Sequence, residues 1–178
     1  MESMKKIILA SAALLLAQLV SRGEIRFDGQ VYSLGWEAKT NGATIKEFYT
    51  GHERTNTWKT MVTVQTHPNA TKVKEVSGPY FEARKSLISM APKVHAKKEG
   101  DSSDAILELF LGIPGKTDHL EFVLARFVET PAGVNMVVFS YRLPLSKKKN
   151  QDIDVSAVMK NNDKWIQQLF DIPVDSIK

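Results

Sequence analysis

The chain contains no cysteine among its 178 residues. This absence excludes disulfide bonds and thiolate metal sites, and it excludes a bacterial lipoprotein, whose lipid is attached to a cysteine at the cleavage site. A eukaryotic secreted domain of this size usually carries disulfide bridges. If the chain is exported, the lack of cysteine therefore favours a bacterial periplasm, with secretion to the medium as the alternative.

Long apolar runs are also missing. The longest run, at residues 7–20, has 14 residues, whereas a membrane-spanning helix needs about 20. Lys5 and Lys6 precede it, and small and polar residues follow it, which is the layout of a secretory signal peptide. We predict a signal peptide over residues 1–23, cut after Ser21 or Gly23, and a single domain over residues 24–178. A short N-terminal membrane anchor, which would be the only contact with a membrane, is the alternative.

The chain has little excess of charge of either sign. The 24 Lys and Arg residues and the 20 Asp and Glu residues give a net charge of +4, and without residues 1–23 the balance is 21 against 19. Such a chain lacks the basic surface that nucleic-acid binding requires, so we expect no nucleic-acid partner. The lysine runs at 97–98 and 147–149 are interpreted as solvated loops. Contact of these runs with anionic lipid head groups is the alternative.

Motifs of metal binding and catalysis are absent. The four histidines, at positions 52, 67, 95 and 119, include no close pair of the kind that zinc sites use. There is no Gly-x-Ser-x-Gly elbow and no glycine-rich phosphate loop. We therefore expect no enzyme, no metal and no cofactor. A hydrolase whose residues meet only in the folded chain is the alternative.

The patterns that are present indicate strands and two helices. Hydrophobic residues make up 43% of the chain and charged residues 25%, which is typical of a globular domain. Helical spacing predicts one helix with Ser77 as N-cap and Pro79 in its first turn, ending before Pro92, and a second, C-terminal helix that Ile172-Pro173 stops. Alternation and β propensity predict strands at residues 31–39, 43–49, 60–66, 105–112, 119–129 and 134–143. Short connections make neighbouring strands antiparallel, so we predict an α+β fold with a sheet of about six strands flanked by two main helices, in the order βββ-α-βββ-α.

The pair Asn41-Gly42 predicts a two-residue hairpin, because both central residues of a type I′ turn need positive φ. The turn sets the register of the first two strands, with residues 32, 34, 36 and 38 on the inner face. The polar stretch at residues 93–103 is interpreted as an exposed loop. The predicted cross-strand partners are Ala38 and Ile45, Trp36 and Glu47, Leu34 and Tyr49, and, on the other face, Glu37 and Lys46.

Three features together suggest a resemblance to known proteins: this hairpin, the Trp-x-x-Met-Val-Thr-Val strand entry at residues 58–64, and the amphipathic C-terminal helix. The chain resembles small exported bacterial proteins of unknown function whose folds are similar to the PsbP-like group, an antiparallel sheet flanked by helices. The likeness covers most of the chain as architecture, but only residues 58–64 as a motif. It implies a binding or accessory protein without a shared catalytic site, and it assigns no residue roles.

The stretch before the third predicted strand contains the best candidates for a contact surface. We predict a partner-contact rim of Tyr49, His52, Arg54 and Trp58, because Arg, Tyr and Trp dominate binding hot spots. Packing of Trp58 over the end of the sheet is the alternative, and the other two tryptophans are predicted to lie in the core.

The predicted function follows from the export signal, the missing motifs and the resemblance. We expect a periplasmic, non-enzymatic accessory protein that binds a protein or envelope partner, and an immunity or inhibitor protein is one version of this. A carrier that holds a small molecule or lipid between the sheet and a helix is the alternative.

Overall fold

The computed structural model describes residues 23–40, 42–98, 100–101, 103–112, 119–145 and 155–173. Most of the predicted signal peptide, Asn41 and the lysine run at 147–149 lie outside these residues. The described strands form one antiparallel sheet of eight, in the order β1-β2-β3-β4-β8-β7-β6-β5. They are β1 (Glu24–Phe27), β2 (Gln30–Thr40), β3 (Ala43–Thr50), β4 (Thr60–His67), β5 (Lys93–Ala96), β6 (Asp104–Gly112), β7 (His119–Thr130) and β8 (Gly133–Pro144).

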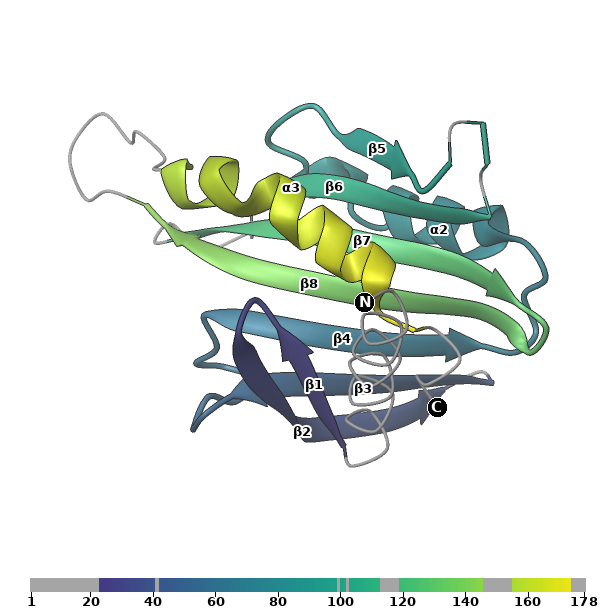
Figure 1. Cartoon of the computed structure of the whole chain (residues 1–178), viewed down its shortest axis with the longest axis horizontal. Helices are drawn as coiled ribbons and strands as arrows, with labels where there is room; N and C mark the ends of the chain where they lie inside the picture. The colour runs from purple at the N-terminus through teal and green to yellow at the C-terminus, as the bar shows by residue number, and fades with distance from the viewer. Residues whose placement is uncertain are drawn as a thin grey trace, which may run out of the picture.

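Two helices cover the sheet from opposite sides. Helix α3 (Ser156–Asp171) crosses one face over β6, β7 and β8, while α2 (Val73–Glu82) lies on the other face (Figure 1). A single 3-10 turn, η1 (Lys85–Leu87), follows α2. We call the two sides of the sheet the α3 face and the α2 face.

The prediction of about six strands in the order βββ-α-βββ-α is wrong, although the α+β class and the antiparallel sheet fit the structure. The order is ββββ-α-ββββ-α, and the two missed strands, β1 and β5, are the edges of the sheet. Each has only four residues, too few for an alternating pattern to be recognised. The polar stretch predicted as a loop contains β5, because an edge strand pairs on one side only and tolerates lysine.

The β2–β3 hairpin follows the predicted register near its turn and departs from it at Gly35. Trp36 faces Glu47 as predicted, but a β-bulge then makes Leu34 face Phe48 and not Tyr49. A Cβ on Gly35 would lie 2.5 Å from Cδ2 of Tyr49, so only glycine fits at the bulge. The extra residue places Leu34 and Trp36 on opposite faces, and both are exposed, at 42% and 44%. The predicted inner positions of these two side chains are therefore wrong.

Helix α2 begins four residues before the predicted N-cap Ser77, and Pro79 lies in its interior and not in its first turn. Its N-terminus is capped by carboxylates. Glu75 accepts the backbone N–H of Thr71 at 2.8 Å, and Glu129 of β7 accepts that of Val73 at 3.1 Å. The bond to Val73 satisfies a donor that the first turn of a helix leaves unpaired. The predicted C-terminal helix, in contrast, ends at Asp171, directly before Ile172-Pro173, as expected.

The α3 face is closed. Trp165 is 3% exposed and packs among aromatic rings of β7 and β8, with its centroid 5.0 Å from that of Phe139. The first hairpin folds over this face, because Phe27 of β1 lies 4.5 Å from Phe139, centroid to centroid. Asp28 then joins α3 through the ammonium group of Lys164, 2.6 Å from its Oδ1. The predicted core position of Trp165 is confirmed.

The α2 face is covered over only part of its width. Helix α2 packs over β6, β7 and β8, where its buried residues Val73 and Val76 join the core of that face. No described helix packs over β2, β3 and β4 on this side. A groove therefore runs beside the helix, and it is the candidate site.

Candidate functional site

The four residues of the predicted contact rim do not share one exposed surface. His52 and Arg54 are exposed, whereas Tyr49 and Trp58 are 3% and 5% exposed. A contact role for His52 and Arg54 stays a prediction, while the indole of Trp58 and the ring of Tyr49 are packed inside the protein.

Trp58 is held by an arginine from β8. The guanidinium carbon of Arg142 lies 3.7 Å from the centroid of the indole, and its Nη1 donates to the Trp58 carbonyl at 3.1 Å. Trp58 therefore packs over the end of the sheet, which is the alternative that the sequence left open. The hydroxyl of Tyr49 is bonded to Glu47 and Thr55, and burial together with the bond to Glu47 raises its pKa to about 12.

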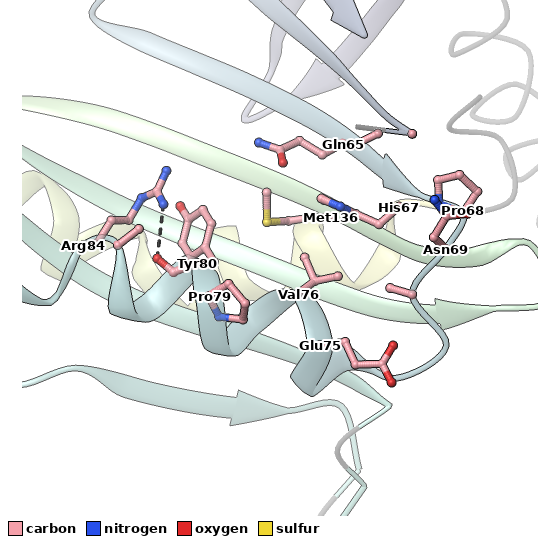
Figure 2. Close-up of a pocket in the computed structure, with 14 residues that line it drawn as sticks. Gln65, His67, Pro68, Asn69, Glu75, Val76, Pro79, Tyr80, Arg84 and Met136 are labelled. Atoms are coloured by element: carbon pink, nitrogen blue, oxygen red, sulfur yellow. Dashed lines mark hydrogen bonds between the residues drawn. The ribbon is translucent and has the colours of Figure 1, made fainter. Parts of the chain in front are cut away.

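The groove on the α2 face consists of two adjoining hollows of about 540 Å³ and about 280 Å³. They share Gln65 of β4 and, from the helix side, Tyr80 and Arg84. Figure 2 shows the larger hollow, with α2 on one side and residues of β4 and β8 on the other. The smaller hollow continues over the sheet toward Trp36 of β2. We call this combined surface the α2 groove.

A stacked pair forms the helix side of the α2 groove. The guanidinium carbon of Arg84 lies 3.6 Å from the centroid of the Tyr80 ring, and Nη1 of Arg84 donates to the Tyr80 carbonyl at 3.2 Å (Figure 2). The ring of Tyr80 meets Phe127 edge-on, with centroids 5.5 Å apart. Burial raises the pKa of Tyr80, so its hydroxyl stays protonated. The pair is thus held in place by contacts on both sides of the Tyr80 ring.

Trp36 lies on the sheet side of the smaller hollow, which it lines together with Tyr80 and Arg84. Trp, Tyr and Arg are the residue types that dominate binding hot spots. Trp36 and Tyr80 both have apolar spacing that indicates a core, so the sequence does not point to them as contact residues. The signal that could have identified Trp36 is Gly35, since an isolated glycine within a strand pattern suggests a bulge.

His67 adds an unpaired nitrogen to the larger hollow. Its Nε2 is buried and has no hydrogen-bond partner within the described part of the chain, and the residue lines the hollow beside Met136 and Pro68 (Figure 2). Burial lowers the pKa of His67, which keeps the ring neutral. A neutral imidazole can give or accept one more hydrogen bond, so this end of the groove has an unused polar group.

A histidine–carboxylate pair lies on the α3 face. Nε2 of His95 is 2.9 Å from Oε2 of Glu108, which also accepts from Asn162 of α3 at 3.0 Å, while Lys93 lies 3.3 Å from Oε1. Burial alone would raise the pKa of Glu108, but the bonds from Asn162 and His95 and the charge of Lys93 lower it overall. The cluster ties β5, β6 and α3 together and lies away from the α2 groove.

Within residues 23–173, apart from the segments left undescribed, no three His, Asp or Glu side chains are placed to hold a metal ion. No helix in the described part of the chain is both long and apolar enough to cross a membrane.

The fold and site define a class of protein: an α+β protein with one antiparallel sheet, closed by a helix on one face and grooved on the other. The chain belongs to an uncharacterised protein family, whose profile matches residues 19–174. Comparisons with curated proteins and with solved structures found no match.

Proposed function

We propose that the protein is a non-enzymatic binding protein that is exported to the periplasm, or secreted, and that holds a protein partner in the α2 groove. The observation that carries this proposal is Trp36, whose indole is 44% exposed in the same hollow as the stacked Tyr80–Arg84 pair. The signal-peptide layout of residues 1–23 supports export. The resemblance to PsbP-like proteins, drawn from the sequence, agrees with an accessory role and is part of the proposal.

The lining of the groove favours a protein partner over a lipid. Apolar surface from Trp36 and Met61 alternates with the charges of Arg84, Glu47 and Glu121. Protein interfaces combine aromatic residues and arginine with polar groups in this way, whereas small-ligand sites are mostly apolar. An immunity or inhibitor protein, which must occupy the surface of another protein, is the version that fits such a groove without catalytic groups.

Photo-crosslinking from two positions of β2 tests the proposal. A photoreactive amino acid replaces Trp36 in one variant and Leu34 in the other; the two positions have almost the same exposure but lie on opposite faces of the sheet. We expect one discrete crosslinked protein from position 36 in envelope extracts and none from position 34. The same products from both positions, or none from either, would contradict the proposal.

Affinity measurements with the isolated partner then test the roles of the side chains. Trp36→Ala should weaken binding by about 30-fold, the effect of a hot-spot residue, while Leu34→Ala should change it by less than about 3-fold. An equal loss in both variants would mean that the face carrying Trp36 is not the contact surface.

A further inference from the structure

A second cavity lies on the other side of α2, between this helix and the edge of the sheet at β5 and β6. Its volume is about 850 Å³, and it shares no lining residue with the α2 groove. We call it the β5 cavity. Its interior is apolar, with side chains from α2, β5, β6 and β7: Val73, Phe81, Val94, Ala105, Leu107 and Phe127. Size and lining match those of small-ligand sites, which span about 300–1,000 Å³ and are mostly hydrophobic.

The cavity exists because α2 presents small residues to it. Ser77 and Gly78 line it from the middle of the helix, where glycine is a poor helix former compared with alanine. The backbone does not require glycine, since Gly78 is not among the residues with positive φ. A Cβ at this position would meet no atom within 4 Å. What Gly78 provides is therefore open space beside the apolar wall.

An exposed valine borders the same space. Val94 of β5 is 72% exposed, the highest value among the large hydrophobic side chains that the structure describes. Edge strands usually carry polar residues at exposed positions. In β5, Lys93 follows this pattern and Ala96 is small, so Val94 is the exception. An apolar group bound in the β5 cavity would cover Val94 and remove this surface from water.

The charged groups that line the cavity balance each other. Lys72 and Lys74 come from the start of α2, and Asp101 and Glu129 from the sheet side. Lys72 and Glu129 are paired at 3.1 Å, and Oδ1 of Asp101 accepts from the backbone N–H and the hydroxyl of Ser103 at 2.8 and 2.6 Å. The ammonium group of Lys74 and Oδ2 of Asp101 are the charged groups that can contact a ligand. This arrangement complements a head group that carries both signs, and it does not favour an anion or a cation alone.

We propose that the β5 cavity binds a single-chain amphiphile with a zwitterionic head group. The acyl chain lies against Phe81, Leu107 and Val94, and the head group lies between Lys74 and Asp101. One chain is proposed because the cavity has the volume of a site for one small ligand. The proposal does not depend on the α2 groove, since the two sites have no lining residue in common.

Calorimetric titration of the mature chain tests the proposal with three dodecyl probes below their micellar concentrations: zwitterionic dodecylphosphocholine, anionic dodecanoate and cationic dodecyltrimethylammonium. We expect saturable binding of dodecylphosphocholine with one molecule per chain, at least 10-fold tighter than that of the other two. No saturable binding of dodecylphosphocholine would overturn the proposal. Tighter binding of the anion or of the cation would overturn it as well.

Two substitutions at one position locate the binding site. Gly78→Leu places a side chain in the open space and should weaken dodecylphosphocholine binding at least 10-fold, while Gly78→Ala, which adds one methyl group, should change it less than 3-fold. Melting curves of both variants verify that they fold. Equal binding by a folded Gly78→Leu variant would show that the probe binds elsewhere. Unchanged binding in Trp36→Ala is expected, and its loss would contradict the independence of the two sites.

Discussion

The two faces of the sheet differ in how completely they are used for packing. On the α3 face a helix, the sheet and the first hairpin enclose one continuous core, and its buried charged groups are paired. On the α2 face the helix covers only β6, β7 and β8, and a cavity lies on each side of it. The difference suggests that the α3 face supplies most of the stability of the fold, which leaves the α2 face free to bind.

A buried arginine shows how the α3 face is held. Arg126 is 2% exposed, and its guanidinium donates to both carboxylate oxygens of Asp104 at 2.8 Å. It also donates to the carbonyls of Leu169 and Ile172 at 2.6 and 2.8 Å. Carbonyls at the end of a helix have no partner within the helix and carry partial negative charge. Arg126 therefore fastens the C-terminal end of α3 to β6 and β7.

Replacement of this arginine should have the largest effect on stability. Arg126→Met leaves Asp104 and two carbonyls without their donor, and breaking a buried ion pair in this way costs about 3–5 kcal/mol. Chemical denaturation measures the loss. Arg26→Met, at an exposed position on β1, is the control and should change stability by less than about 0.5 kcal/mol. Similar losses in both variants would contradict the importance of the α3 anchor.

The two tryptophans that lie on opposite faces provide the most direct comparison. Trp165→Ala should cost about 3–5 kcal/mol, because it leaves a void among packed aromatic rings. Trp36→Ala should cost less than about 1 kcal/mol, since a half-exposed side chain loses little buried area. Thermal and chemical unfolding of the two variants check the difference. Equal costs would mean that the α2 face contributes to folding as much as the α3 face does.

Glu108 should make the contribution of the α3 face to the stability of the fold depend on pH. Its pKa in the folded protein is below the ordinary value of 4.5, so its contribution is complete above about pH 4.5 and is lost as the pH falls through the lower value. At pH 7, Glu108→Gln should cost about 1–3 kcal/mol, because bonds to a buried charged group are lost. As the pH falls below 4.5, the difference between the variant and the parent should shrink. A difference that stays constant from pH 7 to the lowest pH at which both proteins fold would contradict this assignment.

His67, on the α2 face, should have the smallest effect on stability. As for Glu108, the stability should decrease as the pH falls. Burial lowers its pKa in the folded protein from 6.5, so the unfolded chain binds more protons just below pH 6.5 and stability decreases there. His67→Gln cannot titrate, and its melting temperature should decrease less between pH 7.5 and pH 5.5 than that of the parent. Parallel profiles would show that His67 is not the source of the slope.

The central strands could be predicted from the sequence, whereas the edges could not. Strands β4, β6, β7 and β8 lie within two residues of the predicted segments, because long strands with apolar residues on both faces leave a strong pattern. The start of α2 depends on Glu129, which is 56 residues away from its partner Val73. A local pattern cannot contain such a contact.

The candidate site could not be predicted from the sequence for the same reason. The α2 groove joins residues of β2, β4 and α2 that no short motif connects. Simple alternation through Gly35 predicts a core position for Trp36, and the bulge makes this prediction wrong. The predicted rim and the α2 groove contain the same residue types, Trp, Tyr and Arg, but the position of Trp36 in the groove depends on one irregularity of the backbone.

That irregularity lets one strand contribute to both faces of the sheet. Residues 34 and 36 would share a face in a regular strand, but the bulge at Gly35 places Leu34 opposite Phe48, while Trp36 stays opposite Glu47 on the groove side. With the same turn and a regular ladder through Gly35, Leu34 and Tyr32 would lie on the face of Trp36, and the core of the α3 face would lose the ring of Tyr32. One glycine therefore allows the first half of β2 to pack in the core and the second half to line the groove.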